Sequence, residues 1–179
     1  MCIRDSFSTL HTKDALGAVF RLLDMGVPAY LLAAALTGVV AQRLVRRLCP
    51  HCSEPSEEAL PAWAEGASLT GQLWRAAGCA ACGGTGFSGR LALQELLLVD
   101  AALQQAIVHR AGLEEMRELA RRQGMRTLAE DGIEKALQGR TTLSEVVRVL
   151  YGEADAADFS GNFSGAARGL FGGADDGGV

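Results

Sequence analysis

Cys49-Pro-His-Cys52 and Cys79-Ala-Ala-Cys82 are the two stretches that decide how the middle of this 179-residue chain folds. Two residues separate the cysteines within each pair, and 26 residues separate the pairs. This spacing lets a turn direct both sulfurs of a pair at one ion, and four thiolates form a closed tetrahedral zinc site. Because a closed site leaves no place for water, the pattern predicts a structural zinc ion bound by all four cysteines.

Other uses of cysteine fit this pattern less well. Disulfides are rare in cytosolic proteins, and a redox Cys-x-x-Cys pair does not need a second pair. His51 lies inside the first pair and could replace one thiolate, although four are available. Cys2, the fifth cysteine, is given no role. A bound zinc ion would supply on the order of 10 kcal/mol toward folding a short segment that has little core of its own.

Residues 49–90 differ in composition from the chain on either side. They hold three of the four prolines, and between the cysteine pairs there are four glutamates against one arginine. Proline, glycine and polar clusters of this kind mark turns and loops. We therefore expect a small, loop-rich module that interrupts a more regular fold.

Upstream of this module, the sequence predicts a strand, two helices and a second strand. Residues 7–12 contain β-formers and precede Asp14, which can cap a helix over residues 15–24. The next helix, from Pro28 to about residue 36 or 37, is apolar nearly all round, so we expect it to be buried. Residues 39–48 favour a strand by their β-branched content, although their basic residues would also suit a continuing helix.

Downstream of the module, the sequence predicts one strand followed by helices. Residues 90–99 form an apolar run, and Asp100 can cap a helix that ends near residue 109. Apolar residues at helical spacing then continue to residue 150. Thr142-Leu-Ser-Glu145 predicts a capping box at the start of the last helix. Residues 152–179 hold eight glycines and no sustained period, which predicts a disordered tail.

The composition is that of a soluble globular protein, with 49% apolar and 21% charged residues. Residues 1–151 hold sixteen acids and sixteen bases, so the net charge of −4 comes from the tail. The balanced charge of residues 1–151 and the acidic linker between the cysteine pairs argue against a nucleic-acid partner.

The longest mostly apolar stretch, residues 27–41, is shorter than the roughly 20 residues that cross a bilayer. Residues 1–6 do not form a secretory signal, so we expect a cytoplasmic location. These six residues also fit poorly with the residues after them, so we interpret them as a non-native start.

A series of motifs lies on both sides of the cysteine pairs. In chain order they are Phe7-Ser-Thr-Leu-His-Thr-Lys-Asp-Ala15, Arg21-Leu-Leu-Asp-Met-Gly-Val27, Val40-Ala-Gln-Arg-Leu-Val-Arg-Arg-Leu-Cys-Pro50, Thr85-Gly-Phe-Ser-Gly-Arg90, Gln94-Glu-Leu-Leu97, Gly124-Met-Arg-Thr-Leu-Ala-Glu-Asp-Gly132 and Thr141-Thr-Leu-Ser-Glu-Val146. Together they resemble the C-terminal half of the type II secretion and type IV pilus assembly ATPases. The pilus retraction branch of that superfamily lacks the cysteine insert, so the likeness favours the secretion or assembly branch.

This resemblance, which covers about residues 7–151, implies an α/β fold. The implied architecture is the C-terminal part of a RecA-like P-loop ATPase core, with a small zinc-binding insert and a C-terminal helical domain. The implied division of the chain is residues 7–48 for the end of the core, 49–90 for the tetracysteine insert, 91–151 for the returning strand and helical domain, and 152–179 for the tail.

The resemblance also implies roles for three further residues. Ser8-Thr9-Leu10-His11-Thr12 matches the family's His box, whose histidine faces the γ-phosphate of ATP, a position suited to sensing hydrolysis. By residue type alone, His11 would be a surface histidine beside a helix cap. The family usually has asparagine where this chain has Lys13, which affects local loop contacts. Gln42 and Arg43 match a segment near the nucleotide and the subunit boundary, with a solvated strand face as the alternative.

The sequence lacks a phosphate loop of the form Gly-x-x-x-x-Gly-Lys-Ser/Thr. Gly83-Gly-Thr-Gly86 has no lysine and follows a cysteine pair, not a strand. In the family, the phosphate loop and the catalytic acidic residues precede the His box. We therefore interpret the chain as the C-terminal portion of a longer ATPase and expect it to be inactive by itself.

The implied full-length enzyme binds ATP and Mg²⁺ and assembles as a homo-hexamer. Its implied partners are the inner-membrane platform and the cytoplasmic docking proteins of a secretion or pilus machine, which would hold it at the bacterial inner membrane. The alternative is a standalone zinc-binding interaction module without enzymatic activity. Residues 79–86 resemble the zinc repeat of a chaperone cofactor, although that repeat normally occurs four times and here occurs once.

Overall fold

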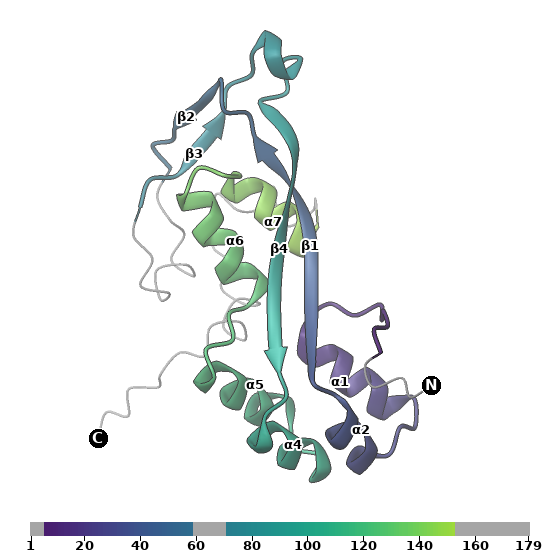
Figure 1. Ribbon diagram of the computed structural model, residues 1–179. Coiled ribbons are helices and arrows are strands. Elements are labelled where there is room, and N and C mark those ends of the chain that lie inside the picture. The colour runs from purple at the N-terminus through teal and green to yellow at the C-terminus, as the bar shows by residue number, and fades with distance from the viewer. Residues whose placement is uncertain (1–5, 59–70, 153–179) are drawn as a thin grey trace, which may run out of the picture. The chain divides into compact units, whose positions relative to one another are not determined.

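The computed structural model describes residues 6–58 and 71–152 (Figure 1). Its elements are α1 (Ala15–Asp24), α2 (Ala29–Ala35), β1 (Gly38–Leu48), β2 (Ser53–Pro55), β3 (Trp74–Ala76), the 3-10 helix η1 (Ala80–Cys82), β4 (Phe87–Leu98), α4 (Ala101–Val108), α5 (Leu113–Arg122), α6 (Leu128–Leu137) and α7 (Leu143–Tyr151). The predicted α/β class is therefore confirmed. Within the described ranges, no helix is both long and apolar enough to span a bilayer.

The described residues form two compact units, each assembled from two stretches of chain. Unit 1 comprises Met1–Gln42 and Gln94–Thr127, and unit 2 comprises Arg43–Leu93 and Leu128–Val179, each within the described ranges. Both β1 and β4 pass through the two units, and they pair with each other in a two-stranded sheet. Each of the predicted segments 7–48 and 91–151 is therefore divided between the two units. The assignment of these segments to domains stays a prediction.

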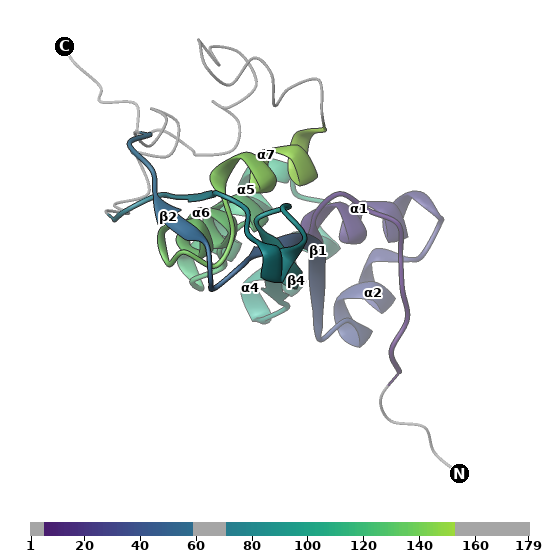
Figure 2. The ribbon, with the colours of Figure 1, turned by 90° about the horizontal axis from the view of Figure 1, so that it is seen from above.

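In unit 1, the helices pack around the paired ends of β1 and β4. Two of these helices begin as predicted, because the Asp14 carboxylate accepts the Gly17 N–H at 2.6 Å and the Asp100 carboxylate accepts the Leu103 N–H at 2.9 Å. α1 and α2 lie side by side in both views (Figure 1 and Figure 2). The hydrophobic core of this unit consists of Ala15, Leu16, Val19, Leu32, Ala33, Leu97, Val99, Leu103, Ala106, Ile107, Met116 and Ala120.

Two predictions for unit 1 are wrong. Residues 7–12 form no strand. A strand needs a neighbouring strand to pair with its backbone N–H and C=O groups. The two sheets within the described ranges pair β1 with β4 and β2 with β3, so neither contains this segment. The helix from Pro28 is also less buried than its composition predicted, since Leu32 and Ala33 pack toward α4 while Tyr30 is 64% exposed.

In unit 2, α6 and α7 pack together beside the paired β1 and β4 segments (Figure 1 and Figure 2). Gly132 allows this close approach, because a Cβ there would lie 2.5 Å from a Val146 methyl group. The strand prediction for residues 39–48 is confirmed by β1, and pairing with β1 extends β4 upstream of its predicted start, to Phe87. The predicted tail lies outside the described residues, apart from Gly152.

The predicted capping box at the start of α7 forms only in part. The Thr142 hydroxyl accepts the Glu145 N–H as predicted. The Glu145 carboxylate, however, accepts bonds from the Arg46 backbone N–H at 3.0 Å, the Arg46 guanidinium at 2.8 Å and the Arg148 guanidinium at 2.7 Å. This carboxylate joins α7 to β1, and its side chain is 1% exposed. A buried anion needs such partners, so the long-range arginine replaces the local cap.

Glu145 makes the stability of unit 2 sensitive to acid. Burial would raise the pKa of this carboxyl group, but the hydrogen bonds from Arg148 and Arg46 outweigh burial and lower the pKa from 4.5 to about 2. A group whose pKa is lowered by folding stabilises the folded state above its unfolded pKa, and this stabilisation is lost as the pH falls through the folded value.

We therefore expect the stabilising contribution of Glu145 to disappear between about pH 5 and pH 2. Glu145→Gln should be less stable than the unchanged protein at pH 7, and the gap should narrow as the pH falls. Urea unfolding followed by circular dichroism at several pH values measures this difference. Glu114→Gln, which alters an exposed glutamate that pairs with Arg117 on α5, is the control and should change little. A gap that stays constant with pH would contradict this role for Glu145.

Candidate metal centre

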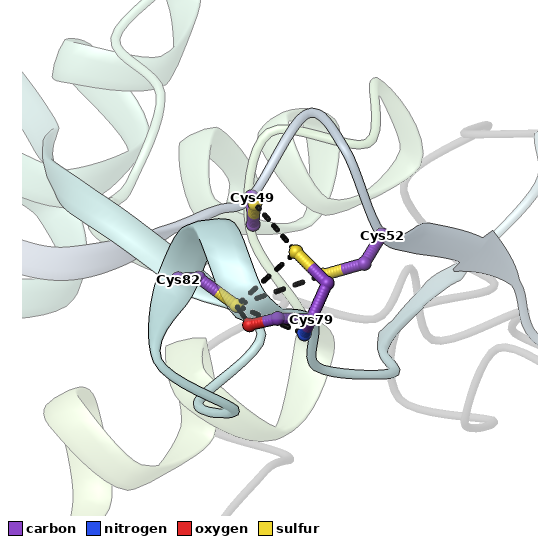
Figure 3. A group of neighbouring side chains, drawn as sticks. All are labelled: Cys49, Cys52, Cys79 and Cys82. Carbon is purple, nitrogen blue, oxygen red and sulfur yellow. Dashed lines mark hydrogen bonds between the residues drawn. The ribbon is translucent and has the colours of Figure 1, made fainter.

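The four paired cysteines come from two short turns that flank the β2–β3 hairpin. Cys49 follows β1 directly and Cys52 precedes β2, whereas Cys79 is the N-cap of η1 and Cys82 is its last residue. β2 and β3 pair antiparallel, with Ser53 opposite Ala76, which places the ends of the two turns next to each other. Figure 3 shows the four side chains converging from these turns. The structure therefore brings together all four residues of the predicted site.

The sulfur positions match the geometry of one metal ion. All four Sγ atoms lie within 4.8 Å of one another. The separations are 4.0 Å between Cys49 and Cys79, 3.8 Å between Cys52 and Cys82, and 3.8 Å between Cys79 and Cys82. A regular tetrahedron with zinc–sulfur bonds of about 2.3 Å has sulfur–sulfur edges of about 3.8 Å. The four thiols are free, and their separations are far longer than a disulfide bond of about 2 Å.

Backbone amide groups around the Cys82 sulfur favour its charged form. Cys82 Sγ accepts the Cys79 N–H at 3.2 Å and the Gly86 N–H at 3.1 Å. The Gly86 carbonyl in turn accepts the Cys49 N–H at 3.0 Å, which ties the second turn to the first. Amide donors of this kind orient thiolates and offset their negative charge, as expected around metal ligands.

Two glycines allow the chain to close around the sulfurs. Gly86 has a φ of 73°, and a Cβ there would lie 2.5 Å from the Ala76 Cβ. Gly78 has a φ of 89°, and a Cβ there would lie 2.5 Å from the Gly84 carbonyl oxygen. Both positions combine a left-handed backbone with a close approach that no side chain could fit. In the sequence, Gly86 belongs to the motif of residues 85–90 and to the failed phosphate-loop match, whereas no motif includes Gly78.

The thiols differ in how readily they lose a proton. The hydrogen bond from the Cys79 amide, together with that from Gly86, lowers the pKa of Cys82 to about 6. Desolvation, together with hydrogen bonds to the other three thiols, raises the pKa of Cys52 to about 12. Four adjacent thiolates repel one another, so a cation is needed to ionise the whole set. The donor set is thus compatible with a zinc site.

His51 is not part of this group. The described residues that cluster at metal-binding distance are Cys49, Cys52, Cys79 and Cys82, and the His51 side chain is exposed. The first turn directs its two cysteines inward and leaves His51 on the outside.

The other three predicted site residues lie elsewhere. His11 is exposed in the irregular segment before α1, in unit 1. Gln42 is exposed on β1 as the last residue of the first stretch of unit 1, and Arg43 is half-buried as the first residue of unit 2. None of the three belongs to the cysteine cluster, and their predicted contacts with a nucleotide stay predictions.

Known proteins resemble this chain over most of its length. Residues 4–148 match the family described as type II/IV secretion system protein. The chain is 49% identical over 145 residues to the type IV pilus assembly ATPase PilB of Thermus thermophilus, covering 78% of this chain and 16% of that protein. It is 46% identical over 145 residues to the type II secretion system ATPase E of Vibrio cholerae, covering 79% of this chain and 29% of that protein.

A third relative, the type II secretion system protein HxcR of Pseudomonas aeruginosa, is 44% identical over 142 residues, covering 79% of this chain and 27% of that protein. The α/β fold and the tetracysteine cluster therefore belong to a protein of the type II/IV secretion system family. The matched region spans less than a third of the length of each of these three relatives.

Proposed function

We propose that this chain is the C-terminal portion of an ATPase that powers type II protein secretion or type IV pilus assembly. The observation that carries the proposal is the match of residues 4–148 to one family, with relatives at 44–49% identity, two of which are named ATPases. A standalone zinc-binding interaction module is not favoured, because the match includes unit 1 as well as the segment with the cysteines.

In this proposal, the chain contributes residues to a nucleotide site that the longer enzyme completes. His11 would donate a hydrogen bond to a phosphate oxygen, and Gln42 and Arg43 would lie near the nucleotide and the subunit boundary. The exposure of His11 ahead of the capped N-terminus of α1 supports this role, because the side chain is accessible to a ligand. Phosphoryl transfer depends on positioning and charge stabilisation, which a fixed imidazole can supply.

The cysteine cluster has a structural role in the proposal. Cys49, Cys52, Cys79 and Cys82 would hold zinc, which supplies folding energy to the turns when bound and takes no part in the chemistry. A RecA-like core would then carry a metal-stabilised insert between β1 and β4. The proposed enzyme is a homo-hexamer that acts through inner-membrane platform and docking proteins.

We expect the 179-residue chain to show no ATP hydrolysis by itself, because its sequence has no phosphate loop. The same chain, extended upstream to the length of its relatives, should hydrolyse ATP with Mg²⁺. A coupled assay of phosphate release on both purified proteins measures this difference. Hydrolysis by the short chain after rigorous purification, or none by the extended chain as an assembled oligomer, would contradict the proposal.

A further inference from the structure

Glu95 is a buried carboxylate on β4 that makes a hydrogen bond to the distant start of α1. It is 4% exposed and lies between Leu93 and Leu97 in the alternating pattern of the strand, so it points inward where the neighbouring inward positions are apolar. Placing a carboxylate there is costly unless hydrogen bonds compensate the lost hydration. An apolar side chain would suit the packing better, which indicates that the carboxylate has a specific task.

One partner of this carboxylate is the first amide of α1. Glu95 Oε1 accepts the Ala15 N–H at 2.8 Å, a contact that spans 80 residues of sequence. The first amides of a helix have no partner within the helix, and the helix N-terminus carries a partial positive charge, so a carboxylate is well placed there. α4 and α7 are capped by the side chains of Asp100 and Thr142, directly ahead of them. α1 has the equivalent cap from Asp14 and receives Glu95 in addition.

The contacts around this point fix the segment that leads into α1. The Asp14 carboxylate accepts the Gly17 N–H at 2.6 Å, and the Thr12 hydroxyl donates to the Asp14 carbonyl at 3.0 Å. Gly17 leaves room for this arrangement, because a Cβ there would lie 2.8 Å from Asp14 Oδ1. Glu95 therefore holds the end of a short chain of contacts whose other end, Thr12, is the immediate neighbour of His11.

We infer that Glu95 is a positioning residue for His11, and that it holds the segment before α1 in the conformation that presents the imidazole to a nucleotide phosphate. The inference rests on the proposed function of His11. Loss of the hydrogen bond from Ala15 to Glu95 would remove a direct contact between the start of α1 and the buried face of β4. An exposed segment that belongs to neither sheet needs such an anchor if one of its side chains is to act at a fixed position.

The test uses the full-length ATPase with four variants: His11→Ala, Glu95→Leu, Glu95→Gln and the double variant His11→Ala/Glu95→Leu. Glu95→Leu removes the acceptor and suits the apolar surroundings, whereas Glu95→Gln keeps an acceptor oxygen and should restore part of the activity. Asp100→Ala is the matched control, because it removes the cap of another helix in the same unit without touching α1.

We expect Glu95→Leu to lower kcat by about tenfold or more, since small displacements of catalytic groups cost one to two orders of magnitude. The KM for ATP should change by no more than about twofold, because the lost interaction acts in the transition state. Hydrogen exchange of residues 7–17, measured by mass spectrometry, should speed up in Glu95→Leu and not in Asp100→Ala. The double variant should be no slower than His11→Ala alone, because both changes remove the same effect.

The outcomes separate the inference from the function on which it rests. If His11→Ala leaves ATP turnover unchanged, the proposed role of His11 is wrong and so is the inference. If ATP turnover falls in His11→Ala but not in Glu95→Leu, the inference alone is wrong. An equal fall in Asp100→Ala, or a further large fall in the double variant, would do the same, since Glu95 would then act through general stability or through another group.

Discussion

Cys79→Ser is expected to abolish metal binding and to release the two turns that hold the cysteines. Cys79 Sγ lies 3.8 Å from Cys82 Sγ in its own turn and 4.0 Å from Cys49 Sγ in the other turn, so it is in contact with sulfurs of both turns. A serine hydroxyl is a poor ligand for zinc, and three thiolates leave the site open to water. The lost binding energy, on the order of 10 kcal/mol for structural zinc, is then no longer available for folding this segment.

Metal content per chain, measured by elemental analysis, should fall from one zinc to almost none. Hydrogen exchange should speed up in residues 49–58 and 71–86 and stay unchanged in unit 1. Cys2→Ser is the control, since it makes the same chemical change at the cysteine that belongs to neither Cys-x-x-Cys pair, and it should retain the metal. Full metal content in Cys79→Ser would rule out the four-thiolate site.

His11→Ala in the full-length enzyme is expected to slow ATP hydrolysis by about a hundredfold, which is typical for removal of a single charge-stabilising donor. The change should appear in kcat, with the KM for ATP and the zinc content unchanged, because the side chain is exposed and far in sequence from the cysteines. His109→Ala is the matched control, since His109 is another exposed histidine of unit 1, at the end of α4. Equal turnover in His11→Ala and His109→Ala would remove His11 from the nucleotide site.

The cysteine site could be predicted from the sequence because its signal is local. Two Cys-x-x-Cys pairs specify the ligands, and the sulfurs converge as that spacing requires. The helix starts at Asp14 and Asp100 were predicted for the same reason, because an N-cap side chain bonds an amide three residues ahead.

Features that depend on distant partners were missed. Glu145 was predicted to complete a local capping box, but its carboxylate bonds Arg46, which is 99 positions away in the sequence. In the sequence, Glu95 is one residue of the Gln94-Glu-Leu-Leu97 motif, and its contact with Ala15 depends on a partner 80 residues away. The strand predicted for residues 7–12 failed because β-forming residues make a strand only where another strand can pair with them.

In our proposal, four thiolates hold one zinc ion between the turns after β1 and before β4. X-ray absorption at the zinc edge of the purified protein measures the number and type of the ligands. We predict a single shell of four sulfur atoms at about 2.3 Å. A shell that includes nitrogen at about 2.0 Å would indicate that a histidine replaces a cysteine, and a protein that binds no zinc would contradict the site altogether.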